Sequence, residues 1–182
     1  MDKALVLIDL QNDYFPGGKM ELAGSLEAVA RAGKRLEAFR RQGLPVIHIQ
    51  HLALRPGASF FLPGTAGAEI HPRVQPLAGE TVIQKNYPNG FRQTGLLEGL
   101  QALGVRQLAL AGMMTHMCVE ATTRAACDLG FECLLAHDAC ATRALSFGAV
   151  SVPAEQVQAA FVAALQGLYA RVQTAGDIAA GL

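Results

Sequence analysis

Short apolar runs alternate with amphipathic segments along the whole chain, and this alternation constrains the fold more than any other feature. Five of the runs, rich in Val, Ile and Leu, have the length of strands buried on both faces. They span residues 4–8, 45–49, 81–83, 107–111 and 131–136. Between them, apolar residues recur at helical spacing, as at Leu26, Val29, Leu36 and Phe39, and again at Met117, Ala121, Ala125 and Leu129.

This alternation predicts the α/β class, because parallel strands require long crossover connections and helices supply them. We expect a single domain over residues 1–182 with three layers, α/β/α, built around a mostly parallel, doubly wound, Rossmann-like sheet of five or six strands. The sixth strand, at 171–173, would follow a helix that opens near Pro153. A chain of 182 residues, 51% of them hydrophobic, is large enough to bury such a core.

The stretch from residue 52 to residue 79 breaks the alternation. It has no helical pattern and carries four prolines, Pro56, Pro63, Pro72 and Pro76. Long irregular segments in compact domains are commonly functional loops. We therefore expect this segment to fold over the functional site.

The balance of charge argues against several classes of partner. Fifteen basic and fifteen acidic residues cancel, and no run of Lys and Arg exceeds a pair, so neither nucleic acid nor a membrane surface is an expected partner. The first apolar run is too short for a secretory or membrane-spanning segment, which predicts a cytoplasmic location. In that compartment the four cysteines should be reduced. The expected ligand is a small molecule.

Three polar residues follow predicted strands, at the positions where open parallel sheets bind ligands. Asp9 ends the first strand, Lys85 follows the third, and Cys118 lies shortly after the fourth, at the start of a helix. A lysine and a helix N-terminus both stabilise a thiolate, so we expect the Cys118 thiolate to be populated at neutral pH. Asp9 could then carry protons. Taken singly, the three residues have plainer interpretations: a small core cysteine, a turn carboxylate and a solvated lysine.

The segments around these residues form three motifs. The first is Asp9-Leu10-Gln11-Asn12-Asp13, the second is the strand end at Lys85, and the third is Gly112-Met113-Met114-Thr115 followed by Cys118-Val119. Two loop segments, 61–65 and 69–72, accompany them. In their order and spacing, over nearly the whole chain, these motifs resemble the isochorismatase-like cysteine hydrolases.

The resemblance implies a catalytic triad of Asp9, Lys85 and Cys118, and a cis peptide bond between Met113 and Met114. It also implies an oxyanion hole formed by the backbone N–H groups of Met114 and Cys118. The implied activity is cleavage of a C–N bond in a small amide or ureido substrate, with Cys118 as nucleophile and a thioester intermediate. Relatives of this kind are usually oligomers, so a homo-oligomer, either a dimer or a tetramer, is expected.

Three other functions stay open on the sequence. Hydrolysis of the vinyl ether of isochorismate, which gives the family its name, needs acid catalysis and no nucleophile, and members with that activity commonly lack the cysteine. A non-catalytic binding module could keep the same fold. A nucleotide-binding Rossmann domain is disfavoured, because no G-x-G-x-x-G motif follows the first strand. The presence of Cys118 favours the amidase.

The resemblance also bears on metals and on the pocket. Nicotinamidases of the family hold a metal through an Asp-x-His pair and a further histidine, whereas here Ile49 takes the Asp position before His51, and the next histidine is His71. We therefore expect no metal and no other cofactor, and nicotinamide is disfavoured as a substrate. The candidates for substrate binding are aromatic residues near the triad and one histidine: Phe15, Phe60, Phe61, Tyr87, Phe91 and His116.

Overall fold

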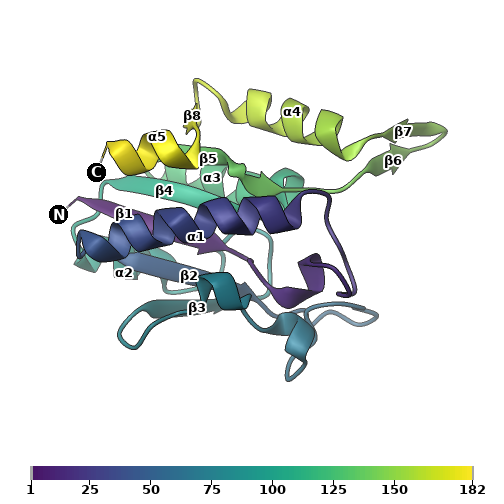
Figure 1. Cartoon of the computed structure of the whole chain (residues 1–182), viewed down its shortest axis with the longest axis horizontal. Helices are drawn as coiled ribbons and strands as arrows, with labels where there is room; N and C mark the ends of the chain where they lie inside the picture. The colour runs from purple at the N-terminus through teal and green to yellow at the C-terminus, as the bar shows by residue number, and fades with distance from the viewer. Residues whose placement is uncertain (1, 182) are drawn as a thin grey trace.

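A six-stranded parallel sheet runs through the middle of the molecule (Figure 1). The computed structural model describes residues 2–181, so residues 1 and 182 of the expected domain lie outside it. In spatial order the strands are β3 (Thr81–Lys85), β2 (Val46–His51), β1 (Lys3–Ile8), β4 (Gln107–Met113), β5 (Glu132–Ala141) and β8 (Arg171–Gln173). Each adjacent pair is parallel. The predicted α/β class is confirmed, with six strands in the main sheet.

Helices cover both faces of the sheet, because successive side chains on a strand point to opposite faces. In β1, Leu5 packs into one apolar cluster and Val6 into another. The first cluster is covered by α1 (Ser25–Arg41) and α5 (Ala175–Ala180), and the second by α2 (Leu96–Ala102), α3 (Glu120–Asp128) and α4 (Ala154–Leu165). Burial on both faces explains why the strands appear in the sequence as continuous apolar runs.

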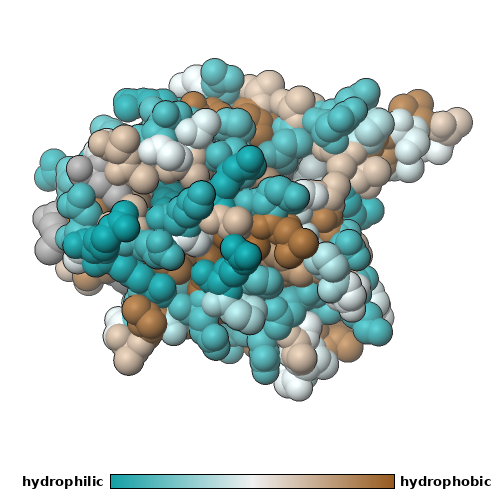
Figure 2. All heavy atoms as spheres, viewed as in Figure 1, coloured by the Kyte–Doolittle hydropathy of each residue, from teal (hydrophilic) through white to brown (hydrophobic). Residues whose placement is uncertain are grey.

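An antiparallel hairpin, which the sequence did not predict, follows β5 in the chain and precedes α4. Its strands are β6 (Leu145–Phe147) and β7 (Val150–Val152), and its turn contains Gly148 with φ +58°. The hairpin projects from the body of the molecule (Figure 1), and Figure 2 shows hydrophobic spheres near the end of the projection. Strands of three residues are too short for their periodicity to be recognised in a sequence.

Helix α3 turns a different face to the core than we expected. The expected apolar stripe included Met117 and Leu129, but these residues are 38% and 45% exposed. Thr122, Thr123 and Ala126 are buried instead. The cause is a π-helix over Thr115–Val119, because its wider turn holds an extra residue and shifts the phase of the helix that follows.

The irregular segment from 52 to 79 is confirmed as a long loop that contains two short 3₁₀ turns, Ala66–Ala68 and Pro72–Val74. A backbone hydrogen bond from the Ala53 N–H to the Phe61 carbonyl folds its first part back on itself. This loop lies against the carboxyl end of the sheet through contacts described below. Within residues 2–181, no helix is long and apolar enough to cross a membrane.

Candidate active site

The carboxyl ends of β1 and β4 lie side by side at the centre of the sheet, where the order of the strands reverses. Asp9 follows β1, Lys85 is the last residue of β3, and Cys118 lies in the π-helix that follows β4. The Lys85 Nζ atom lies 2.7 Å from Asp9 Oδ2 and 3.3 Å from Cys118 Sγ. All three residues are buried. Folding thus gathers a carboxylate, an ammonium and a thiol from three distant segments.

A fourth residue, His51, belongs to this cluster and was not among the residues that the sequence indicated for catalysis. It ends β2 directly opposite Lys85 in the register of β2 and β3. Its Nδ1 atom lies 2.9 Å from Lys85 Nζ. Burial lowers the pKa of His51, and the Lys85 charge lowers it further, so the ring is neutral and Nδ1 can accept a hydrogen bond from the ammonium. The signal available in the sequence was a polar residue at the end of the neighbouring strand.

The electrostatics of the cluster favour an ammonium beside a neutral thiol. Burial lowers the pKa of Lys85, but the charge of Asp9 and hydrogen bonds to Asp9 and Cys118 outweigh it and raise the pKa above its ordinary value. Burial raises the pKa of the Cys118 thiol, and Asp9 raises it further, against an opposing effect of Lys85. The expectation of a standing thiolate is therefore wrong, because a second buried negative charge beside Asp9 costs more than the lysine offsets.

Asp9 is placed to receive the thiol proton. Lys85 holds its Oδ2 atom, whereas Oδ1 is buried and finds no hydrogen-bond partner in the part of the chain that the structure describes. A buried carboxylate oxygen without a partner is costly, and such atoms are typical of functional sites. The backbone of Asp9 is left-handed, with φ +51°, a conformation that aspartate tolerates better than most residues.

The cluster suits an ammonium better than a metal ion. One ligand atom from each of Asp9, His51 and Cys118 could surround an ion, since these atoms lie within 4.8 Å of one another. Lys85 Nζ, however, lies 2.7 to 3.3 Å from a polar atom of each, so its positive charge occupies the centre of the group. Ile49 is a buried apolar residue, and the His71 side chain accepts a backbone N–H in its own turn. The residues present do not fit a metal of the nicotinamidase type.

A cavity of about 360 Å³ opens onto Cys118. Phe60, Phe61 and Tyr87, all proposed from the sequence as substrate-binding residues, are on its walls, together with Tyr14. Its lining also includes one charged side chain, Arg55, and the imidazole of His51. The cavity is therefore small, mostly apolar with several aromatic side chains, and positively charged at one point.

The other three residues proposed for the pocket lie elsewhere. Phe15 is buried in the core, where its ring packs on His71 with centroids 4.1 Å apart. Phe91 stacks on Phe131, on the face of the sheet covered by α2 and α3. His116, in the π-helix, hydrogen-bonds Thr142 at 2.6 Å. Each is near a member of the triad in sequence, but its side chain packs on other residues and does not line this cavity.

The first motif also holds the long loop against the site, a role that sequence reasoning did not assign. Gln11 Nε2 donates to the carbonyl oxygens of His51 and Ala68 at 2.9 and 2.7 Å, and Gln11 Oε1 accepts the His51 N–H. Asp13 Oδ2 accepts the Phe61 N–H at 2.7 Å. Two polar side chains after Asp9 therefore fasten both the end of β2 and the wall of the cavity.

The connection from β4 to the nucleophile has an unusual backbone. The peptide bond between Met113 and Met114 is cis, as the resemblance implied. Gly112 just before it has φ +144°, and a Cβ atom there would lie 2.0 Å from the Ile8 carbonyl oxygen. Only glycine lets β4 approach β1 this closely. The role of the N–H groups of Met114 and Cys118 as oxyanion donors stays a prediction.

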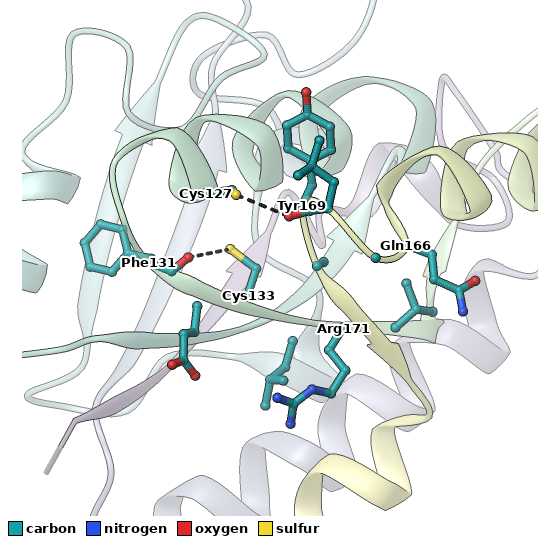
Figure 3. Close-up of a pocket in the computed structure, with 12 residues that line it drawn as sticks. Cys127, Phe131, Cys133, Gln166, Tyr169 and Arg171 are labelled. Atoms are coloured by element: carbon teal, nitrogen blue, oxygen red, sulfur yellow. Dashed lines mark hydrogen bonds between the residues drawn. The ribbon is translucent and has the colours of Figure 1, made fainter.

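A larger cavity, of about 510 Å³, lies away from the triad and is lined by residues of α3, β5 and β8 (Figure 3). Cys127 and Cys133 both line it, but their sulfurs donate to different carbonyl oxygens, those of Leu168 and Phe131. The four cysteines are free thiols, as expected. We place the chemistry at the smaller cavity because it contains the nucleophile and the ion pair.

Known proteins share both the sequence and the fold. A family model described as the Isochorismatase domain matches residues 3–176. YddQ, an uncharacterized isochorismatase family protein of Bacillus subtilis strain 168, is 50% identical over 174 residues, which are 96% of this chain and 97% of YddQ. Nicotinamidase 3 of Arabidopsis thaliana is 30% identical over 76% of this chain and 73% of its own length.

A solved structure gives the same result. The crystal structure of a protein from Oleispira antarctica, classed as an isochorismatase hydrolase, matches with a TM-score of 0.95 and 49% identity, over 99% of this chain and 97% of the other. Agreement therefore covers both the sequence and the complete fold. On the family model and these relatives together, the chain belongs to the isochorismatase family of hydrolases.

Proposed function

We propose that this protein is a cysteine hydrolase that cleaves the C–N bond of a small amide or ureido compound through a thioester on Cys118. The observation that carries the proposal is the buried cluster, in which one ammonium contacts a thiol at 3.3 Å and a carboxylate at 2.7 Å. A nucleophile, a proton carrier and a fixed positive charge are the groups that acyl transfer requires. Nicotinamidase 3, one of the relatives, carries the name of an amidase.

The geometry supports a two-step mechanism. The Cys118 thiol gives its proton to the free Asp9 Oδ1 as the sulfur attacks the carbonyl carbon. The C–N bond then breaks, and Asp9 passes the proton to the departing nitrogen. Water next attacks the thioester while Asp9 accepts a proton from it, the C–S bond breaks, and the proton returns to the sulfur.

Lys85 keeps the charge balanced through these steps. Before reaction, its ammonium neutralises Asp9. When Asp9 takes the thiol proton, the negative charge moves to the sulfur and then to the carbonyl oxygen, within reach of the same ammonium. The N–H groups of Met114 and Cys118 are the proposed donors to that oxygen. Thus a thiol that is neutral at rest becomes the nucleophile as Asp9 takes its proton.

The buried thiol favours this reaction over hydrolysis of a vinyl ether. Cleavage of isochorismate proceeds through an acid and needs no nucleophile, so it would leave Cys118 without a role. The cavity adds a preference of its own: about 360 Å³ suits a small compound, and its aromatic walls suit a planar or apolar group. Because Arg55 is the charged residue on the lining, neutral or anionic substrates are favoured over cationic ones.

The test is the release of ammonia from nicotinamide, benzamide and N-carbamoylglycine by the wild type and by Cys118→Ala. We expect turnover to fall by about 10³-fold or more in the variant, because a nucleophile cannot be bypassed in this mechanism. Acid-quenched wild type should carry the acyl group on the Cys118 peptide, as detected by mass spectrometry. Cys127→Ala is the matched control, since Cys127 is a free thiol outside this cavity.

Two outcomes would contradict the proposal. One is a Cys118→Ala variant that hydrolyses the same compound as fast as the wild type. The other is release of pyruvate from isochorismate by both proteins, with no ammonia from any of the amides. The second result would assign the vinyl ether reaction to this site.

A further inference from the structure

Tyr14 is a polar residue on the wall of the active-site cavity to which the mechanism gives no role. It lies in the 3₁₀ turn Asn12–Tyr14, which follows the strand end at Asp9. The residue is 1% exposed, and its ring meets that of Phe61 edge-on with centroids 4.6 Å apart. The ring is therefore fixed by packing, with the nucleophile on the wall of the same cavity.

Within residues 2–181, the Tyr14 hydroxyl forms no hydrogen bond. Its oxygen is nevertheless not fully enclosed by protein atoms. Tyr14 is one of the residues that line the cavity, so we infer that the hydroxyl oxygen opens into it. A polar group in such surroundings gains free energy when a ligand supplies the missing hydrogen bond.

The chemistry of the phenol makes it a donor. Burial raises the pKa of Tyr14 well above its ordinary value, and the charge of Asp9 raises it further, although Arg143 opposes it. The hydroxyl therefore keeps its proton over the whole working range of pH.

We propose that Tyr14 is a further catalytic residue, whose hydroxyl donates a hydrogen bond to the oxygen of the carbonyl group that Cys118 attacks. This inference rests on the proposed cysteine hydrolase. Negative charge that begins on Asp9 passes through the sulfur to that oxygen, and a fixed O–H donor stabilises it most when the charge arrives there. Tyr14 would thus act together with the two backbone N–H groups.

The variant Tyr14→Phe tests the inference, because it removes one oxygen atom and keeps the ring that packs on Phe61. We expect kcat for ammonia release to fall by roughly 10- to 100-fold, with KM changed much less, as for the loss of one donor to a developing charge. The melting temperature should stay close to that of the wild type. Tyr169→Phe is the control, since it removes a hydroxyl from a tyrosine outside this cavity.

A second measurement uses benzaldehyde and needs no turnover. The Cys118 thiol adds across its C=O bond, with sulfur going to carbon and the proton to oxygen, and the product resembles the tetrahedral intermediate. By calorimetry we expect Tyr14→Phe to bind benzaldehyde about 10-fold more weakly than the wild type, and Cys118→Ala to lose the binding.

The two proposals fail in different ways. Equal kcat and equal benzaldehyde affinity in Tyr14→Phe and the wild type would overturn the role of Tyr14, while an inactive Cys118→Ala would still support the hydrolase. Full activity of Cys118→Ala would instead overturn the hydrolase itself. Tyr14 would be assigned to packing alone by two results together. The melting temperature of Tyr14→Phe would fall as far as that of Tyr14→Leu, and the two variants would have the same kcat.

Discussion

The Lys85 ammonium is held by contacts with Asp9, His51 and Cys118. Of these, His51 can be replaced without removing the proposed nucleophile or the proposed proton carrier. We expect His51→Leu to lower kcat by about 10-fold or more with little change in KM, because the loss of a hydrogen bond to a charged group costs roughly 1.5–3 kcal/mol. His51→Asn should recover most of the loss, since its Oδ1 can take the place of Nδ1. Steady-state kinetics of ammonia release measures both.

The pH dependence of kcat gives an independent test of the same residue. Because burial and Lys85 lower the pKa of His51 from 6.5, the ring is still neutral at pH 6.5. It is protonated only in more acidic solution, where it can no longer accept a hydrogen bond from the ammonium. The kcat of the wild type should therefore fall below pH 6.5 as His51 is protonated. His51→Asn should not show this fall, because asparagine does not titrate. A His51→Leu variant with the kcat of the wild type would contradict the role.

At the scale of residues, the sequence indicated the three residues that meet in the cluster but not their surroundings. Asp9 follows β1, Lys85 ends β3 and Cys118 lies shortly after β4, and apolar runs reveal these strands. The contribution of His51 depends on the register that sets it opposite Lys85, and that of Gln11 on a loop distant in the chain. The thiolate expectation failed because the burial of Cys118 is a property of the fold and not of its neighbours in sequence.

At the scale of elements, Glu80 ties helix α1 to strands β2 and β3. Its carboxylate accepts two hydrogen bonds from Arg40 in α1, at 2.7 and 2.8 Å, and lies 2.9 Å from His48 Nε2 in β2. Burial lowers the pKa of His48, so its contact is a hydrogen bond from a neutral ring. The hydrogen bond from Arg40 lowers the pKa of Glu80 from 4.5 to about 2.

We expect Glu80→Gln to lower the free energy of unfolding at pH 7 by about 1–3 kcal/mol, as for hydrogen bonds to a charged group. Because the folded pKa lies below the unfolded one, this stability is complete above pH 4.5 and is lost as the pH falls toward 2. Urea unfolding at pH 7 and pH 3 measures it, and the difference between the wild type and Glu80→Gln should be smaller at pH 3. Glu98→Gln, at an exposed position in α2, is the control. A difference that persists unchanged at pH 3 would refute the charge-based account.

The elements themselves were predictable where apolar periodicity was long. Strands β1 to β5 and the helices between them follow from it, whereas the three-residue edge strand β8 was expected from its place after the helix that opens near Pro153. The β6–β7 hairpin and the π-helix at Thr115–Val119 could not be predicted in this way. The strands of the hairpin are too short to show a period, and the wider turn of the π-helix departs from the 3.6-residue period of an α-helix. The π-helix is nevertheless the element that carries Cys118.

At the scale of the whole molecule, the β6–β7 hairpin has no layer of protein against its outer side. Phe147 is 90% exposed and Val150 is 61% exposed. A two-stranded hairpin is marginally stable in water by itself, and apolar residues on a projecting element mark a contact surface. The formal net charge of the chain is zero, so two copies do not repel each other strongly. We therefore expect a second copy of the chain to cover the hairpin, consistent with the homo-oligomer predicted from the sequence.

Sedimentation equilibrium measures this association directly, since one chain has a mass of 19.2 kDa. The wild type should sediment as a multiple of this mass, and the double variant Phe147→Asp, Val150→Asp should shift toward the single chain, because a carboxylate cannot be buried unpaired in an apolar contact. Leu77→Asp, at an exposed apolar residue before β3, is the matched control and should leave the mass unchanged. A monomeric wild type, or an equal shift in the control, would show that the hairpin does not mediate self-association. Circular dichroism should be the same for all three proteins, because the substituted side chains lie outside the core.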